Sequence, residues 1–133
     1  MANIIRDLSA TERWFEVLPS AARTTAPDTQ EFVLDRRGYN PNGLIFTIDV
    51  TAIAATPSIT VTVSGVDRVS GKLFTVLAAA AITATGTTVL KIGPAMTAAA
   101  GLVANDLVPS VFRVSVSHLD SDSITYSIGG MVA

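Results

Sequence analysis

The feature that most constrains the fold is an alternation of apolar and polar residues that recurs along the chain from residue 44 onward. Because successive side chains of a β-strand point to opposite faces, a segment with this period forms a strand with one buried face. Residues 44–51, 59–64, 112–117 and 124–128 carry the pattern. The alternation therefore predicts a core formed by Leu44, Phe46, Ile48, Val50, Ile59, Val61, Val63, Phe112, Val114, Val116, Ile124, Tyr126 and Ile128.

Shorter signals predict further strands and the turns between them. Residues 13–25 read as an extended segment in which Pro19 indicates an edge strand or a bulge. Residues 32–34, 72–79 and 87–92 are also strand-like, and turn-forming residues separate the segments at 40–43, 56–57, 70–71, 93–94 and 120–122. About seven or eight strands result. This count predicts an all-β chain: a single antiparallel β-sandwich or jelly-roll-like domain with an extended N-terminal arm.

Two segments depart from this pattern. Residues 1–12 hold a weak helical signal, because Asp7, Ser9 and Thr11 are residue types that cap helices or form turns. Residues 95–108 combine Ala and Leu with Gly101, which weakens a helix. A short helix and an ordered loop are equal alternatives for this second segment.

Charged residues are unevenly distributed along the chain. Eleven of them lie before Gly38, and nine serve the rest of the chain. We therefore divide the chain into residues 1–27, an N-terminal arm or edge segment, and residues 28–133, the β-sandwich domain. The arm is expected to grip a neighbouring surface, and its removal over residues 1–12 is expected to leave the fold intact. The candidate interface residues are Arg6, Arg13, Trp14, Phe15 and Arg23.

Trp14 has a second interpretation, because a tryptophan on the first strand also suits a position that caps the core. The remaining surface is poor in charge, since charged residues make up only 15% of the chain. A free monomer with so few surface charges resists aggregation poorly, so such a chain suits a surface that partners cover.

The composition also argues against several classes of function. The net charge is −2, and no basic patch could neutralise a run of phosphates, so we expect no nucleic-acid partner. The longest uncharged run, between Lys72 and Lys91, is broken by threonine and glycine, so we expect no membrane span. The chain has no cysteine, which leaves no thiolate ligand for a metal and no disulfide.

Catalytic and ligand-binding constellations are not recognisable in the sequence. His118 is the only histidine and is expected at a strand end with its ring in solvent. The acids at 120 and 122 read as a hairpin turn rather than a calcium loop, because no further acid follows them. Asp49 and Asp67 are the least implausible catalytic carboxylates, and Gly129-Gly130 does not form a phosphate loop. We therefore expect no enzyme, no cofactor, no metal and no small-molecule substrate.

The segments GLIFTIDVTAI, TPSITVTVSGVDRVSGKLFTVL, LKIGP, NDLVPSVFRVSVSH and SITYSIGG carry a resemblance over residues 43–130. Together they resemble small virion structural proteins of tailed bacteriophages, of the capsid decoration or minor head protein type. The resemblance implies a structural protein that decorates and stabilises the outer capsid through capsomer-bridging contacts. It also implies the major capsid protein as partner, a homotrimer, and a place on the outer capsid surface of a virion assembled in the host bacterial cytoplasm.

Two alternative functions stay open. One is a neck, tail or head-fibre component of the same virion, which the sequence separates poorly from a capsid role. The other is a carbohydrate-binding β-sandwich adsorption module, in which an exposed aromatic ring stacks on a sugar. Aromatic residues make up only 6% of the chain, and the core pattern includes Tyr126, so few rings are left for such a platform.

Overall fold

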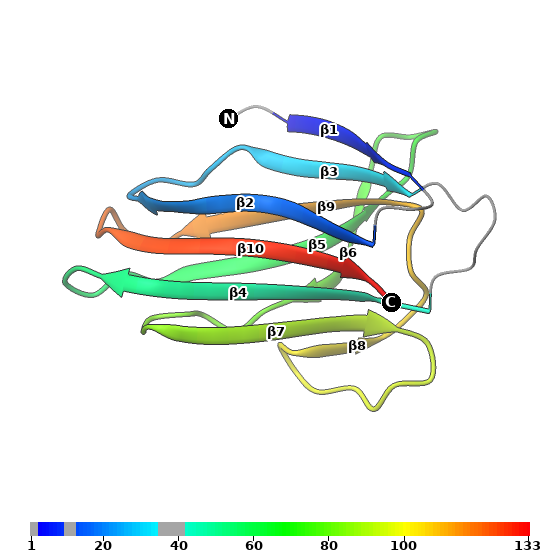
Figure 1. Cartoon of the computed structure of the whole chain (residues 1–133). Coiled ribbons are helices and arrows are strands. Elements are labelled where there is room, and N and C mark those ends of the chain that lie inside the picture. The colour runs from blue at the N-terminus through cyan, green and yellow to red at the C-terminus, as the bar shows by residue number, and fades with distance from the viewer. Residues whose placement is uncertain (1–2, 10–12, 35–41) are drawn as a thin grey trace.

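The computed structural model describes residues 3–9, 13–34 and 42–133, and within these residues it contains ten β-strands and no helix (Figure 1). The strands are β1 (Asn3–Leu8), β2 (Trp14–Arg23), β3 (Thr29–Leu34), β4 (Leu44–Ile53), β5 (Ile59–Val66), β6 (Leu73–Ala78), β7 (Gly86–Gly93), β8 (Val103–Asn105), β9 (Val111–His118) and β10 (Ile124–Val132).

The strands form two five-stranded sheets packed face to face. Sheet A has the order β1-β3-β9-β5-β6, and sheet B has the order β2-β10-β4-β7-β8. Figure 1 shows β10, in red, between β2 and β4 in the nearer layer, with β9 and β5 behind. The predicted all-β sandwich is therefore confirmed.

Eight of the strands pair in a nested order. In chain order, the first of the eight pairs with the last (β2 with β10), the second with the seventh (β3 with β9), and so on inward through β4 with β7 to β5 with β6. All four of these pairs are antiparallel, and the two sheets share them equally. This nesting is the connectivity of a jelly roll.

The remaining two strands correct the predicted count and direction. β1 pairs with β3 in parallel, and the three-residue β8 pairs with β7 in parallel, so both sheets are mixed and the described strands number ten. Neither strand carries a repeated alternation, because each is short and lies at a sheet edge with little of its surface buried. Period-two analysis therefore could not detect them.

The core lies between the sheets and contains all the residues that the alternation predicted, together with others such as Phe15 and Phe32. Every one of the thirteen predicted core side chains is buried, and none is more than 4% exposed. Four phenylalanines meet at its centre: the Phe15 and Phe32 ring centroids lie 4.8 Å apart, and those of Phe32 and Phe112 lie 5.3 Å apart. Phe46 completes the cluster, 5.9 Å from Phe112.

The N-terminal segment corrects the prediction of an extended arm. β1 is an edge strand of sheet A, and β2 is an edge strand of sheet B, so the two strands lie in different layers of the sandwich. Leu8, Phe15, Val17 and Leu18 belong to the core. Removal of residues 1–12 would therefore take away a strand and a buried leucine, and the weak helical signal there is wrong because pairing with β3 imposes an extended backbone over Asn3–Leu8.

The structure also tests the predictions for residues 95–108, for the turn at 120–122 and for Pro19. Residues 95–108 contain no helix: an isolated bridge joins Ala99 to Val103, and β8 follows. The turn at 120–122 is not a hairpin, because β9 lies in sheet A and β10 lies in sheet B. Pro19 does lie on an edge strand, in a region of β2 where the register with β10 shifts. Residues 40 and 41 of the predicted turn at 40–43 lie outside the described residues.

Candidate functional site

The outer face of sheet B carries an exposed aromatic side chain in a row of apolar neighbours. Met131 of β10 lies between Trp14 of β2 and Ile45 of β4 in the strand register. Trp14 is 74% exposed, whereas its neighbour Phe15 points to the other face and is buried. Strand alternation explains this difference, because adjacent residues of β2 face opposite sides of the sheet.

Beside this row the face is hollowed by a groove of about 470 Å³, the Trp14 groove. Gly129 forms part of its floor, between Glu16 and Thr47 in the register, and a Cβ atom added there would meet no atom within 4 Å. The groove exists at this position because glycine leaves the middle of the face without a side chain. Its lining residues are Trp14, Phe15, Glu16, Leu18, Pro19, Ser20, Ile45, Thr47, Ser127, Ile128, Gly129, Gly130 and Met131.

The chemistry of the lining favours binding over catalysis. Among these residues Glu16 is the one ionisable side chain, and it has no histidine or second acid beside it in the lining. Hydroxyl groups of Ser20, Thr47 and Ser127 accompany the Trp14 ring. Such a surface offers a large aromatic contact with hydrogen-bonding groups around it, which suits either a protein or a sugar.

Arg6, a predicted interface residue, instead closes one open edge of the sandwich. Its Nη2 atom donates to the carbonyl oxygens of Glu16, at 2.6 Å, and Val17, at 3.3 Å, and also to Gln30 Oε1 at 3.3 Å. Its guanidinium lies 4.7 Å from the centroid of the Phe32 ring. Because Arg6 belongs to sheet A and the two carbonyl groups to sheet B, this side chain ties the layers together.

Arg23 has a similar structural role at another position. Its Nη1 atom donates to the Tyr126 carbonyl at 2.7 Å, and its Nη2 atom donates to the Pro19 carbonyl at 2.6 Å. The guanidinium lies 4.6 Å from the centre of the Tyr126 ring, so Arg23 fixes the irregular part of β2 against β10. Arg13 is exposed, and its carbonyl accepts from the Val132 amide. The five predicted interface residues therefore do not form one site: Phe15 belongs to the core, and Trp14 is the one that lines the groove with its ring exposed.

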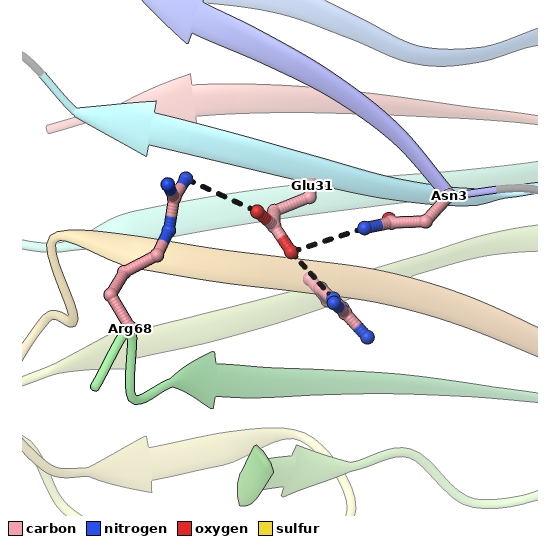
Figure 2. A network of polar contacts seen from close by, with 4 residues as sticks. Asn3, Glu31 and Arg68 are labelled. Carbon is pink, nitrogen blue, oxygen red and sulfur yellow. Dashed lines mark hydrogen bonds and ion pairs between the residues drawn. The ribbon is translucent and has the colours of Figure 1, made fainter. Parts of the chain in front are cut away.

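A second polar cluster lies on the outer face of sheet A, around Glu31. Its Oε1 atom accepts from Arg113 Nε at 2.6 Å and from Asn3 Nδ2 at 3.3 Å, and its Oε2 atom accepts from Arg68 Nη2 at 3.2 Å. Figure 2 shows the Glu31 carboxylate between the side chains of Asn3 and Arg68. Glu31 is only 2% exposed, although it faces outward, because these partners cover it. The cluster connects β1, β3, β9 and the β5–β6 turn.

The charge of Glu31 is held in place by its partners. Burial alone raises the pKa of Glu31, but the hydrogen bonds from Arg113 and Asn3 and the positive charges of Arg113 and Arg68 outweigh it, and the pKa lies below its usual value. Each donor is already engaged with the carboxylate, so this cluster has the character of a structural ion-pair network rather than of a catalytic site.

His118 is not the solvent-facing histidine that the sequence predicted. Its Nε2 atom lies 3.0 Å from the Tyr126 hydroxyl, and the ring is half-buried. Burial and then the charge of Arg23 lower the pKa of His118, against a smaller opposing effect of Asp120. Burial also raises the pKa of Tyr126 to about 12. A neutral histidine and a neutral tyrosine therefore share a hydrogen bond at neutral pH.

None of the acids that the sequence singled out lines the groove, although Asp49 pairs in register with Ser127 at its margin. Asp49 accepts from the Thr87 hydroxyl at 3.3 Å, and Asp67 accepts from Ser70 Oγ at 2.7 Å within the β5–β6 turn. Asp122 accepts from the amide and hydroxyl groups of Thr56. Within residues 3–9, 13–34 and 42–133 no group of three or more His, Asp or Glu side chains is arranged to hold a metal ion.

Sequence reasoning missed Glu31 and the glycine floor of the groove. Glu31 and Arg113 are 82 positions apart, so no local pattern joins them. Gly129 could be found as a small residue on the outer side of a predicted strand. Only the strand order shows that β10 lies between β2 and β4, so that Gly129 lies between the strands of Trp14 and Thr47.

In comparisons with known proteins, no family model, no curated protein and no solved structure matches the chain. In the described part of the chain, no helix is long and apolar enough to cross a membrane.

Proposed function

We propose that the chain is a non-enzymatic structural protein of a tailed-phage virion that sits on the outer capsid surface and binds the major capsid protein through the outer face of sheet B. The observation that carries this proposal is the 74% exposure of Trp14 beside a groove on a face with few charges. Tryptophan is enriched among residues that dominate binding energy at protein interfaces. The sequence resemblance to capsid decoration proteins supplies the identity of the partner.

The size of the molecule fits this role. A standard interface buries about 800 Å² on each partner, which is roughly an eighth of the 6804 Å² surface of this chain. One sheet face can hold such a contact while the other faces stay free. The jelly roll is a fold of viral capsid and lectin domains alike, so the fold agrees with the proposal without deciding it.

The test is binding of the purified chain to undecorated capsids, measured by co-sedimentation over a concentration series. Trp14→Ala should weaken binding about thirtyfold, as expected for loss of a central aromatic contact worth about 2 kcal/mol. Leu119→Ala is the matched control, because Leu119 is 72% exposed but lies between β9 and β10, outside the groove lining. Equal affinities for Trp14→Ala and the unmodified chain would exclude this face as the attachment surface.

A neck, tail or head-fibre location is a variant of the same proposal with another virion protein as partner. Labelled antibody against the chain, imaged on intact particles, separates these locations. Signal distributed over the head supports the capsid role, and signal confined to the neck or tail contradicts it.

A carbohydrate-binding adsorption module is the second candidate, and the lining of the Trp14 groove favours it specifically. The exposed indole ring can stack on a sugar ring, and the hydroxyl groups of Ser20, Thr47 and Ser127 can hydrogen-bond sugar hydroxyls further along the groove. Trp14 is the only tryptophan of the chain, so its fluorescence reports directly on this groove. A glycan that changes this emission, together with no binding to capsids, would favour the adsorption module over the capsid protein.

A further inference from the structure

The two edges of sheet A expose large apolar side chains. β1 and β6 are the end strands of this sheet, and among the described residues each has a strand partner on one side only. Ile5 on β1 is 55% exposed, and Leu73 and Phe74 on β6 are 50% and 52% exposed. Each strand is six residues long, so the two edges match in length.

Sheet A differs from sheet B in how its edges are protected. Natural sheets prevent edge-to-edge pairing with proline, bulges, charged side chains or very short edge strands. In sheet B, β2 contains Pro19 and register shifts, and β8 has three residues. In sheet A, β6 has the sequence LFTVLA, without proline or charge, and its one irregularity is a single register shift with β5 between Val63 and Ser64. The guanidinium of Arg6 on β1 is turned toward the carbonyl groups of β2 and does not guard the edge.

The directions of β1 and β6 allow them to pair between copies. β1 is parallel to β3, and the steps from β3 to β9, β5 and β6 are each antiparallel, so β1 and β6 run in opposite directions. Rotation about an axis along the strands keeps these directions, so β1 of one copy meets β6 of the next as an antiparallel pair.

The charges at these edges are complementary in that arrangement. Antiparallel pairing places the C-terminal end of β1 beside the N-terminal end of β6. Asp7 is near the end of β1, and Lys72 directly precedes β6, and both side chains are exposed. The same end of the shared edge therefore carries an acid on one copy and a base on the other.

We propose that copies of this chain assemble head to tail, with β1 of one copy adding to the free edge of β6 of the next and extending sheet A across the subunits. Backbone hydrogen bonds supply the pairing, and Ile5 covers the apolar surface of Leu73 on the outer face of the sheet. Phe74 points to the opposite face, where its ring lies against Gly65. A heterologous contact of this kind either closes into a ring or continues as a filament. The absence of charge on β6 favours a closed ring, because an open one would leave the uncharged β6 edge exposed at its end.

The first measurement is the mass of the purified full chain by light scattering after size exclusion, at low ionic strength. A single mass that is a multiple of 13.8 kDa is expected. Asp7→Lys alone or Lys72→Asp alone sets like charges against each other at every contact and should raise the dissociation concentration about tenfold. Lys91→Asp is the matched control: it makes the same charge change on β7 of sheet B and should leave the mass unchanged.

The decisive variant carries both Asp7→Lys and Lys72→Asp, because the swapped charges attract again across a head-to-tail contact. Its mass should return to that of the unmodified chain, whereas β1–β1 or β6–β6 contacts would gain nothing from the swap. Circular dichroism of each variant confirms that the sheets are intact.

A monomeric unmodified chain overturns the proposal, and so does a double variant that stays dissociated. The first outcome would leave β6 as an edge for a strand of a different protein. This proposal is independent of the capsid role. A chain that assembles but does not bind capsids would support the assembly and contradict the capsid role. A monomer that binds capsids would do the reverse.

Discussion

Replacement of Glu31 by glutamine tests the role assigned to the charge cluster on sheet A. The substitution keeps the size of the side chain and one acceptor oxygen, and it removes the negative charge. We expect the glutamine oxygen to accept the hydrogen bonds from Arg113 and Asn3, since both side chains donate to Oε1 of Glu31. The new amide group then faces Arg68, which is more than half exposed and can turn toward solvent.

The magnitude follows from the contacts that change. The Arg68 ion pair is largely solvated and contributes at most about 1 kcal/mol. The 2.6 Å bond from Arg113 is short and charge-assisted, and such bonds contribute about 1.5–3 kcal/mol. Because part of that bond survives as a neutral contact, Glu31→Gln should lower the free energy of unfolding by about 2 kcal/mol at pH 7. In a domain of this size the melting temperature should fall by roughly 8 °C.

The assay is urea unfolding at pH 7 and again at pH 3. The pKa of Glu31 is lowered in the folded chain, so its stabilisation is fully present above about 4.5, the value of an unfolded glutamate, and is lost as the pH falls through the lower folded value. The difference between the unmodified chain and Glu31→Gln should therefore shrink at pH 3. Glu16→Gln, an exposed glutamate on β2, is the matched control. A loss below about 0.5 kcal/mol, or one that is equal at both pH values, would refute the reasoning.

Three further measurements address the core and the buried tyrosine. Gly130→Ala would place a Cβ atom 2.3 Å from the Phe15 ring and should lower the free energy of unfolding by about 1–3 kcal/mol. The Cβ atom of Gly129→Ala would meet no atom within 4 Å, so this variant should stay within about 0.5 kcal/mol of the unmodified chain. Equal losses for the two variants in denaturant unfolding would contradict the packing of Phe15. Tyr126→Phe removes the hydrogen bond to His118 and should cost about 1 kcal/mol in the same assay, and an unchanged midpoint would show that water replaces the bond. Because folding lowers the pKa of His118, the stability of the folded chain should decline as the pH falls from 6.5 toward the pKa of His118 in the folded chain. Thermal unfolding over this pH range measures the decline, which should be absent in His118→Gln.

The long strands and the core residues that they carry could be predicted from the sequence because the signal is local. Leu44, Phe46 and Ile48 alternate with less apolar neighbours, and a strand of that pattern has only one way to bury its apolar face. The same argument identified Tyr126 as a core residue despite its hydroxyl. β1 and β8 escaped detection because their extended conformation depends on the strands beside them.

The candidate site was predicted only in part, through Trp14. The sequence placed Trp14 and Phe15 together as interface residues, and the pleat of β2 separates them onto opposite faces. Arg6 and Arg23 were grouped with them because charge and an aromatic pair cluster near the N-terminus. Both guanidinium groups instead satisfy backbone carbonyl groups at sheet edges and irregularities, where the chain cannot pair with itself.

By itself the sequence determined that this chain is a sandwich of strands, which side chains fill its interior, and that its surface is poor in charge. These properties depend on residue type and on spacing over a few positions. Only the tertiary structure decided which strands are neighbours, and with them the groove over Gly129, the contact of Glu31 with Arg113 and the two open edges of sheet A. Each of these joins segments far apart in the chain, and pairing between distant strands is set by the packing of the whole sandwich rather than by any local pattern.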